Sequence, residues 1–165
     1  MFHRVAGTAI VTLLLMGQAK SPAIQGFEKL KALEGDWIDV EGIFGEKGKV
    51  AVTYRVTGGG HTVVETFPVG TANEMVTIYH LDGNNLVLTH YCTSNTQPRM
   101  TSTGLQGNTL AFDFAGGANI DPVKTSHMHG AMIEFVSADE IKATWQNWNH
   151  GKADHAATFR VVRKR

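Results

Sequence analysis

The segment from Glu74 to Arg99 constrains the fold of this chain most strongly, because it has the pattern of a β-hairpin. Two runs rich in β-branched, aromatic and aliphatic residues flank Asp82-Gly83-Asn84-Asn85, whose glycine and asparagines suit a tight turn. We predict that Leu81 pairs with Leu86, and the two-residue period of a strand then defines two faces. One face is apolar near the turn and polar at its far end, which suggests the inner wall of a barrel with a pocket. Its residues are Met75, Thr77, Tyr79, Leu81, Leu86, Leu88, His90 and Cys92.

Glycine-rich turns divide the rest of the chain into short runs of alternating pattern. The predicted strands outside the hairpin cover residues 35–43, 50–57, 61–67, 99–105, 110–114, 127–136, 141–148 and 155–163. Together with the hairpin they give about ten strands joined mostly by short turns, which is an all-β meander. Such a meander folds as a closed antiparallel up-and-down barrel or as a sandwich, and closure favours the barrel because it removes exposed sheet edges.

A short helix is predicted ahead of the first strand. Ile24, Phe27, Leu30 and Leu33 recur at helical spacing, as in an amphipathic helix with one apolar face. We expect this helix to pack on the core as a lid or plug.

Residues 1–19 have the plan of a secretory signal peptide. A short basic start with His3 and Arg4 precedes an apolar stretch, residues 9–16, and the small residue Ala19. The apolar stretch is shorter than the roughly 20 residues that span a bilayer, so we expect cleavage after Ala19 or Ala23 rather than a membrane anchor. The mature chain, residues 20–165, is then expected to be a single domain, periplasmic or secreted, without a membrane span.

Charge and cysteine content exclude several classes of protein. The chain has 15 basic and 15 acidic residues, so it lacks the electrostatic footprint of a nucleic-acid-binding protein. Its single cysteine, Cys92, rules out an internal disulfide, and stability must come from the core. We find no nucleophile elbow, phosphate loop, HExxH or dinucleotide fingerprint, and we assign no catalytic residue.

Gly35-Asp36-Trp37, at the start of the first strand, resembles the G-x-W element of lipocalins and other calycin barrels. In that superfamily the Trp closes one end of the barrel and an Arg of the last strand packs across it, so the resemblance implies this role for Arg160 or Arg163. The segments YRVTGGG, VVETFPVGT, EMVTIYHLDG, LVLTHYC and QPRM also resemble exported bacterial lipocalin-like proteins of unassigned function.

A count of about ten strands is similar to the fatty-acid-binding and nitrobindin-like branches, whereas lipocalins proper have about eight. The nitrobindin likeness implies a heme whose iron is bound by a histidine late in the chain. The histidines in that part of this sequence are His127, His129, His150 and His155.

His90 and Cys92 lie two residues apart and are expected on the same side of a strand, where they could serve a metal or a heme. The alternative is that Cys92 is a small buried apolar residue. His90 would then form a hydrogen bond across the barrel, for which Thr77 is the candidate partner.

His127 and His129 form an H-x-H pair, which can present two imidazoles to one Zn²⁺ or Cu²⁺. His90, Glu65 and His61 are the candidates for a third ligand. The alternative is a pair at the barrel mouth that faces solvent.

Glu65 stands between Val63 and Phe67 in a predicted strand, and a buried carboxylate needs a partner. Arg99 either pairs with Glu65 or grips a ligand carboxylate. The residues expected around an enclosed ligand are Tyr54, Glu65, Tyr79, Leu88, His90, Arg99, Phe112, Phe114 and Trp145. The aromatic members of this set would equally make a filled core.

These patterns favour a non-enzymatic carrier or sensor of a small apolar or amphipathic ligand held inside the barrel. A second hypothesis is a heme or metal site that uses His90, His127 or His129, with redox or isomerase-type chemistry. A third is an interaction module, which would have a large exposed apolar patch and no cavity.

Overall fold

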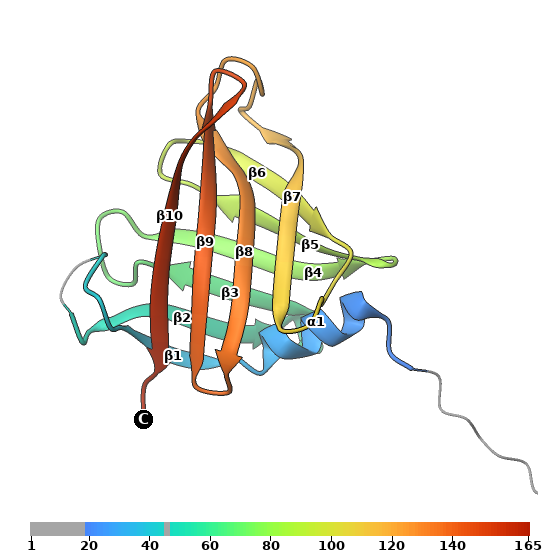
Figure 1. The fold of residues 1–165 in the computed structure, drawn as a ribbon, viewed down its shortest axis with the longest axis vertical. Coiled ribbons are helices and arrows are strands. Elements are labelled where there is room, and N and C mark those ends of the chain that lie inside the picture. Colours follow the sequence, from blue (N-terminus) through green and yellow to red (C-terminus); the bar gives the residue numbers. More distant parts are fainter. Residues whose placement is uncertain (1–18, 45–46) are drawn as a thin grey trace, which may run out of the picture.

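The computed structural model describes residues 19–44 and 47–165, so the predicted signal peptide, apart from Ala19, lies outside the described residues. The described chain forms one α-helix, one short 3₁₀ turn and ten strands (Figure 1). The elements are α1 (Pro22–Lys31), β1 (Gly35–Asp39), β2 (Val50–Thr57), η1 (Gly58–Gly60), β3 (Thr62–Phe67), β4 (Met75–Asp82), β5 (Asn85–Tyr91), β6 (Gln97–Ser102), β7 (Thr109–Ala118), β8 (His127–Ser137), β9 (Glu140–Asn149) and β10 (Lys152–Arg163).

The ten strands form a closed up-and-down barrel. Each strand pairs antiparallel with the next along the chain, and β1 closes the ring by pairing with β10. This confirms the all-β barrel with a short N-terminal helix and excludes the sandwich. Alternate connections of such a barrel lie at the same end, so the β1–β2, β3–β4 and β5–β6 connections share the end opposite α1 (Figure 1).

The central hairpin has the predicted register. Leu81 pairs with Leu86, and Gly83 adopts a left-handed φ of 59° in the turn between them. Thr77 and His90, on the predicted inner face, are buried and directly opposite one another. The alternation of the sequence was therefore sufficient to orient both strands.

Helix α1 closes one end of the barrel, as the helical spacing predicted. Ser21 caps its first turn, and Phe27 and Leu30 join the hydrophobic core. Gly104 allows the β6–β7 connection to reach the start of the helix, because an added Cβ would lie 2.1 Å from the Pro22 carbonyl carbon. The helix therefore acts as a plug.

Trp37 and Arg163 fasten the helix end of the barrel. The Trp37 indole donates a hydrogen bond to the Leu33 carbonyl at 2.7 Å, and the Arg163 guanidinium lies 4.5 Å from the indole centre. The same guanidinium donates hydrogen bonds to the carbonyl oxygens of Ala32, Glu34 and Ala138 and to the Asp139 carboxylate. Of Arg160 and Arg163, the two candidates in the last strand, Arg163 is therefore the one that packs across Trp37.

Replacing Arg163 by Lys is expected to lower the free energy of unfolding by about 2 kcal/mol. Lysine keeps the charge but cannot form this planar set of hydrogen bonds or stack on Trp37 in the same way. The matched control is Arg160→Lys in the same strand, where the Arg pairs with Glu140 at the surface; we expect a loss below about 0.5 kcal/mol. Urea unfolding measures both, and equal losses would contradict the special role of Arg163.

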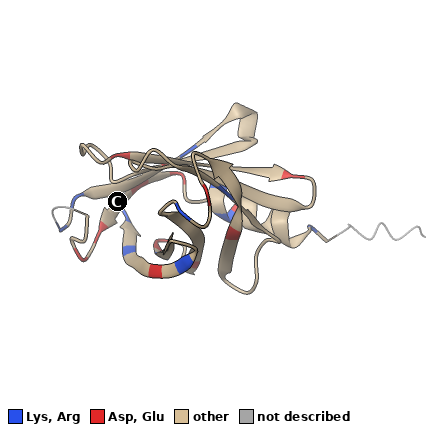
Figure 2. Ribbon diagram, turned by 90° about the horizontal axis from the view of Figure 1, so that it is seen from above, with Lys and Arg blue, Asp and Glu red and all other residues tan. Residues whose placement is uncertain are grey.

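Charged residues are interspersed around the barrel, and neither sign gathers on one side of the described chain (Figure 2). Among the described helical segments, none has the length and apolar character needed to span a bilayer.

Candidate binding site inside the barrel

Four polar side chains form a row across the inner wall. Tyr54, Glu65, Thr77 and His90 come from the consecutive strands β2, β3, β4 and β5, and each lies directly opposite the next. All four are buried. The row exists because the polar positions of four strands coincide in the barrel register, which the sequence of any one strand does not reveal.

Glu65 is held by two tyrosine hydroxyls. Tyr79 donates a hydrogen bond to Glu65 Oε2 at 2.6 Å, and the Tyr54 hydroxyl forms a second one. Burial raises the pKa of Glu65 to about 7, and the two hydrogen bonds oppose that rise without cancelling it. Burial beside this carboxyl also raises the pKa of both tyrosines well above the ordinary value. The two tyrosine hydroxyls therefore bind a buried carboxyl whose pKa lies well above that of an exposed glutamate.

Arg99 is not the partner of Glu65, and the prediction of that ion pair is wrong. In β6 the side chains of Pro98, Met100 and Ser102 are buried, so Arg99 lies on the opposite, outer face. There its guanidinium pairs with the Asp82 carboxylate at 2.8 Å. Arg99 is therefore also not placed to grip a carboxylate inside the barrel.

His90 ends the polar row. Its Nδ1 shares a hydrogen bond of 2.9 Å with the Thr77 hydroxyl, as the sequence suggested, and its ring lies 4.7 Å from that of Trp145. Burial lowers the pKa of His90 to about 4, so the imidazole is neutral near pH 7. The hydrogen bond to Thr77 engages Nδ1, so Nε2 is the ring nitrogen through which His90 would contact a bound molecule. Cys92 lies beyond the end of β5, partly exposed, rather than beside His90 on the strand.

Next to His90 lies a cavity of about 80 Å³ that the inner wall of the barrel lines. Aromatic rings dominate its lining: Phe67 and Phe159 stack at 4.8 Å, and Phe44 packs edge-on against both. The complete lining is Phe44, Phe67, Met75, His90, Met128, Trp145, Ala157 and Phe159. The site is therefore a small, largely apolar space with one imidazole in its wall.

Two of the residues predicted to line a ligand, His90 and Trp145, border this cavity. Tyr54, Tyr79, Leu88 and Phe112 lie in a filled part of the core, each at most 2% exposed. The interior is thus neither wholly filled nor wholly hollow, because large side chains occupy the end near α1 and leave a gap at the other end.

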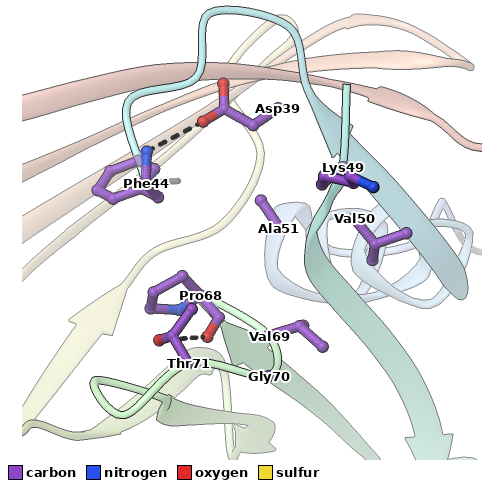
Figure 3. A pocket seen from close by; sticks show the side chains of 9 residues that line it. All are labelled: Asp39, Phe44, Lys49, Val50, Ala51, Pro68, Val69, Gly70 and Thr71. Carbon is purple, nitrogen blue, oxygen red and sulfur yellow. Dashed lines mark hydrogen bonds between the residues drawn. The ribbon is translucent and has the colours of Figure 1, made fainter. Parts of the chain in front are cut away.

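A larger groove lies on the outside, between the β1–β2 and β3–β4 connections. Its volume is about 360 Å³, and Figure 3 shows the side chains around it. They are Asp39, Phe44, Lys49, Val50, Ala51, Pro68, Val69, Gly70 and Thr71. The predicted first strand stops early here because the buried Asp39 carboxylate accepts hydrogen bonds from the backbone N–H groups of Glu41, Gly42 and Phe44, which bends the chain.

His127 and His129 do not join His90. A β-bulge at His129 shifts the register of β8, so His127 lies opposite Trp148 and Met128 borders the cavity instead. His127 Nε2 and His129 Nδ1 share a hydrogen bond of 2.9 Å, and the His129 ring stacks between Phe114 and Trp148. Within residues 19–44 and 47–165 no three His, Cys, Asp or Glu side chains converge as metal ligands. The predicted three-ligand metal site is therefore not formed there, and Phe114 belongs to this cluster rather than to the cavity.

Two of the cavity residues, Phe44 and Met128, could not be predicted from strand alternation. Phe44 comes from a connection, where alternation gives no orientation, and Met128 enters the interior only because of the bulge. Phe67 and Met75, which pair across β3 and β4, were readable as inward residues from alternation. Known proteins add no assignment: no family model matches the chain, and no curated protein matches its sequence.

Proposed function

We propose that this protein binds a small apolar or amphipathic molecule inside its barrel and acts as a carrier or sensor. The observation that carries the proposal is the cavity beside His90, which remains in an otherwise well-packed interior. An apolar lining with one polar group in its wall is the usual make-up of a small-molecule site. The neutral imidazole of His90 would supply the single polar contact through Nε2.

The size of the cavity limits what fits in it. An engineered apolar cavity of about 150 Å³ in another protein stays dry and binds benzene or xenon. The space beside His90, at about 80 Å³, is roughly half as large. It therefore suits a compact group of a few heavy atoms, or the apolar end of a longer molecule.

The heme hypothesis has less support, because the cavity is too small. Drug-sized ligands already need pockets of roughly 300–1,000 Å³, and a porphyrin is larger than such ligands. The interaction-module hypothesis does not account for the cavity. The plan of residues 1–19 supports the further proposal that the protein works outside the cytoplasm, and the barrel supports a place among calycin-like carriers.

Filling the cavity is expected to abolish binding without harming the fold. Ala157 lines the cavity, and Ala157→Leu places a larger apolar side chain in the empty space. We expect wild-type protein to bind toluene and xenon saturably, and the variant to bind them at least about tenfold more weakly. NMR titration of the Trp145 indole N–H measures toluene, and ¹²⁹Xe NMR measures xenon.

The matched control is Ala156→Leu, which changes the neighbouring, exposed residue on the outside of β10. This variant should bind both molecules like the wild type. Equal stability of the two variants in urea separates loss of the site from loss of the fold. A wild-type protein that takes up neither toluene nor xenon would overturn the proposed function.

A further inference from the structure

Phe44 is the one described residue that lines both the inner cavity and the outer groove. Its ring packs edge-on at 4.3 Å from Phe67 and 4.8 Å from Phe159, and so forms a wall of the cavity. Its other side borders the groove (Figure 3). The two spaces therefore meet at this side chain.

The way in which Phe44 is held suits a movable partition. Asp39 Oδ2 accepts a hydrogen bond from the Phe44 backbone N–H at 3.1 Å, which fixes the backbone but not the ring (Figure 3). Phe67 and Phe159 belong to strands and are buried, whereas Phe44 belongs to a connection and is only partly buried. Rotation about the Phe44 side-chain bonds would join the cavity to the groove and leave both strands in place.

Each space alone is incomplete as a ligand site. The cavity, at about 80 Å³, is smaller than the pockets that hold drug-sized molecules, whereas the groove, at about 360 Å³, is within their range but open to solvent. Joined, they offer an aromatic end inside the barrel and a more polar end at the groove.

The chemistry of the lining changes along this path. The cavity is aromatic and thioether-rich, from Phe67 and Phe159 to Met75 and Met128. The groove combines apolar and polar residues. The apolar ones include Val50, Ala51, Pro68 and Val69, and the polar ones are Asp39, Lys49 and Thr71. A molecule with an apolar tail and a polar head matches this order.

We infer that the cavity and the groove are two parts of one site for a medium-chain aliphatic amphiphile, whose tail displaces the Phe44 ring and enters the cavity while its head stays in the groove. The inference rests on the proposed function and extends it by naming the ligand class and the route of entry.

The test compares 1-octanol, which needs both spaces, with toluene, which needs only the cavity. Val69→Arg places a long side chain in the groove, and Val69 does not line the cavity. We expect this variant to bind 1-octanol at least about tenfold more weakly and toluene within about twofold of wild type. The control is Val123→Arg, at a residue that is 65% exposed and lines neither space. In wild type, nuclear Overhauser contacts are expected between the octanol methyl group and Trp145, and between its hydroxymethyl group and Val69.

Phe44→Ala and Ala157→Leu separate the possible failures. Removing the Phe44 ring should speed 1-octanol association, whereas filling the cavity should abolish binding of both compounds. If wild type binds toluene but Val69→Arg leaves 1-octanol affinity unchanged, or weakens both compounds equally, the inference is overturned and the proposed function stands. If wild type binds neither compound, both are overturned.

Discussion

Replacing Glu65 by Gln is expected to abolish a pH-dependent loss of stability. Between pH 4.5 and pH 8 the ionisation of Glu65 lowers the free energy of unfolding of the wild-type protein by about 3 kcal/mol. Glu65 has a pKa of about 7 in the folded barrel, because burial disfavours its charge, against 4.5 in an unfolded chain. A carboxyl with a raised pKa binds more protons in the folded state, so its stabilising effect is complete below pH 4.5 and is lost as the pH rises through 7. At 1.36 kcal/mol per pKa unit, the difference amounts to about 3 kcal/mol.

Urea unfolding of both proteins between pH 4 and pH 8 measures this effect as a difference between their free energies of unfolding. The difference should move in favour of Glu65→Gln as the pH rises and level off above pH 8. Carbonyl ¹³C NMR of Glu65 should give a midpoint near pH 7 in the wild type. Tyr79→Phe removes a hydrogen bond to the ionised carboxyl, so it should raise that midpoint further. A midpoint near 4.5, with parallel stability profiles, would mean that the carboxyl is solvated in solution.

Local pattern was sufficient wherever one turn and two alternating runs determine the geometry. The pairing of Leu81 with Leu86 fixed the inner face of the hairpin, and the contact of His90 with Thr77 followed from that register. Glycine turns and alternation also gave the number of strands and hence the barrel. These features depend only on residues that are close together in the sequence, so they can be predicted from one sequence.

Contacts between strands that are distant in sequence were harder to predict, because a shift of one residue in the strand register moves every side chain to the other face of the sheet. Glu65 lies inside the barrel with Val63 and Phe67, whereas Arg99 lies outside, and the sequence of either strand alone does not show how the two strands are placed relative to one another. The bulge at His129 likewise brings Met128, and not His127, to the cavity. Phe44 lies in a connection whose path depends on Asp39, so the partition between cavity and groove became visible only in the folded chain.

Replacing His90 by Asn is expected to have the opposite pH dependence to Glu65→Gln. The folded-state pKa of His90 is lowered to about 4 by burial, against 6.5 in an unfolded chain. The unfolded chain therefore binds more protons between these values, so the wild-type protein is fully stabilised above pH 6.5 and loses about 3 kcal/mol as the pH falls through 4. Asparagine keeps a polar group near the position of Nδ1, within reach of Thr77, but has no proton to gain.

The two buried groups thus oppose one another between pH 4.5 and pH 6.5, where Glu65 favours lower pH and His90 favours higher pH. The free energy of unfolding of His90→Asn, relative to wild type, should rise as the pH falls from 7 to 4, whatever constant loss the smaller side chain causes. His155→Asn removes a solvent-exposed imidazole and serves as the matched control. Direct ¹⁵N NMR should show His90 neutral down to about pH 5, since its midpoint lies near 4. Protonation of His90 near pH 6.5 in the folded protein would show instead that water or another polar group solvates the ring, and the apolar cavity beside it would have to be abandoned as the binding site.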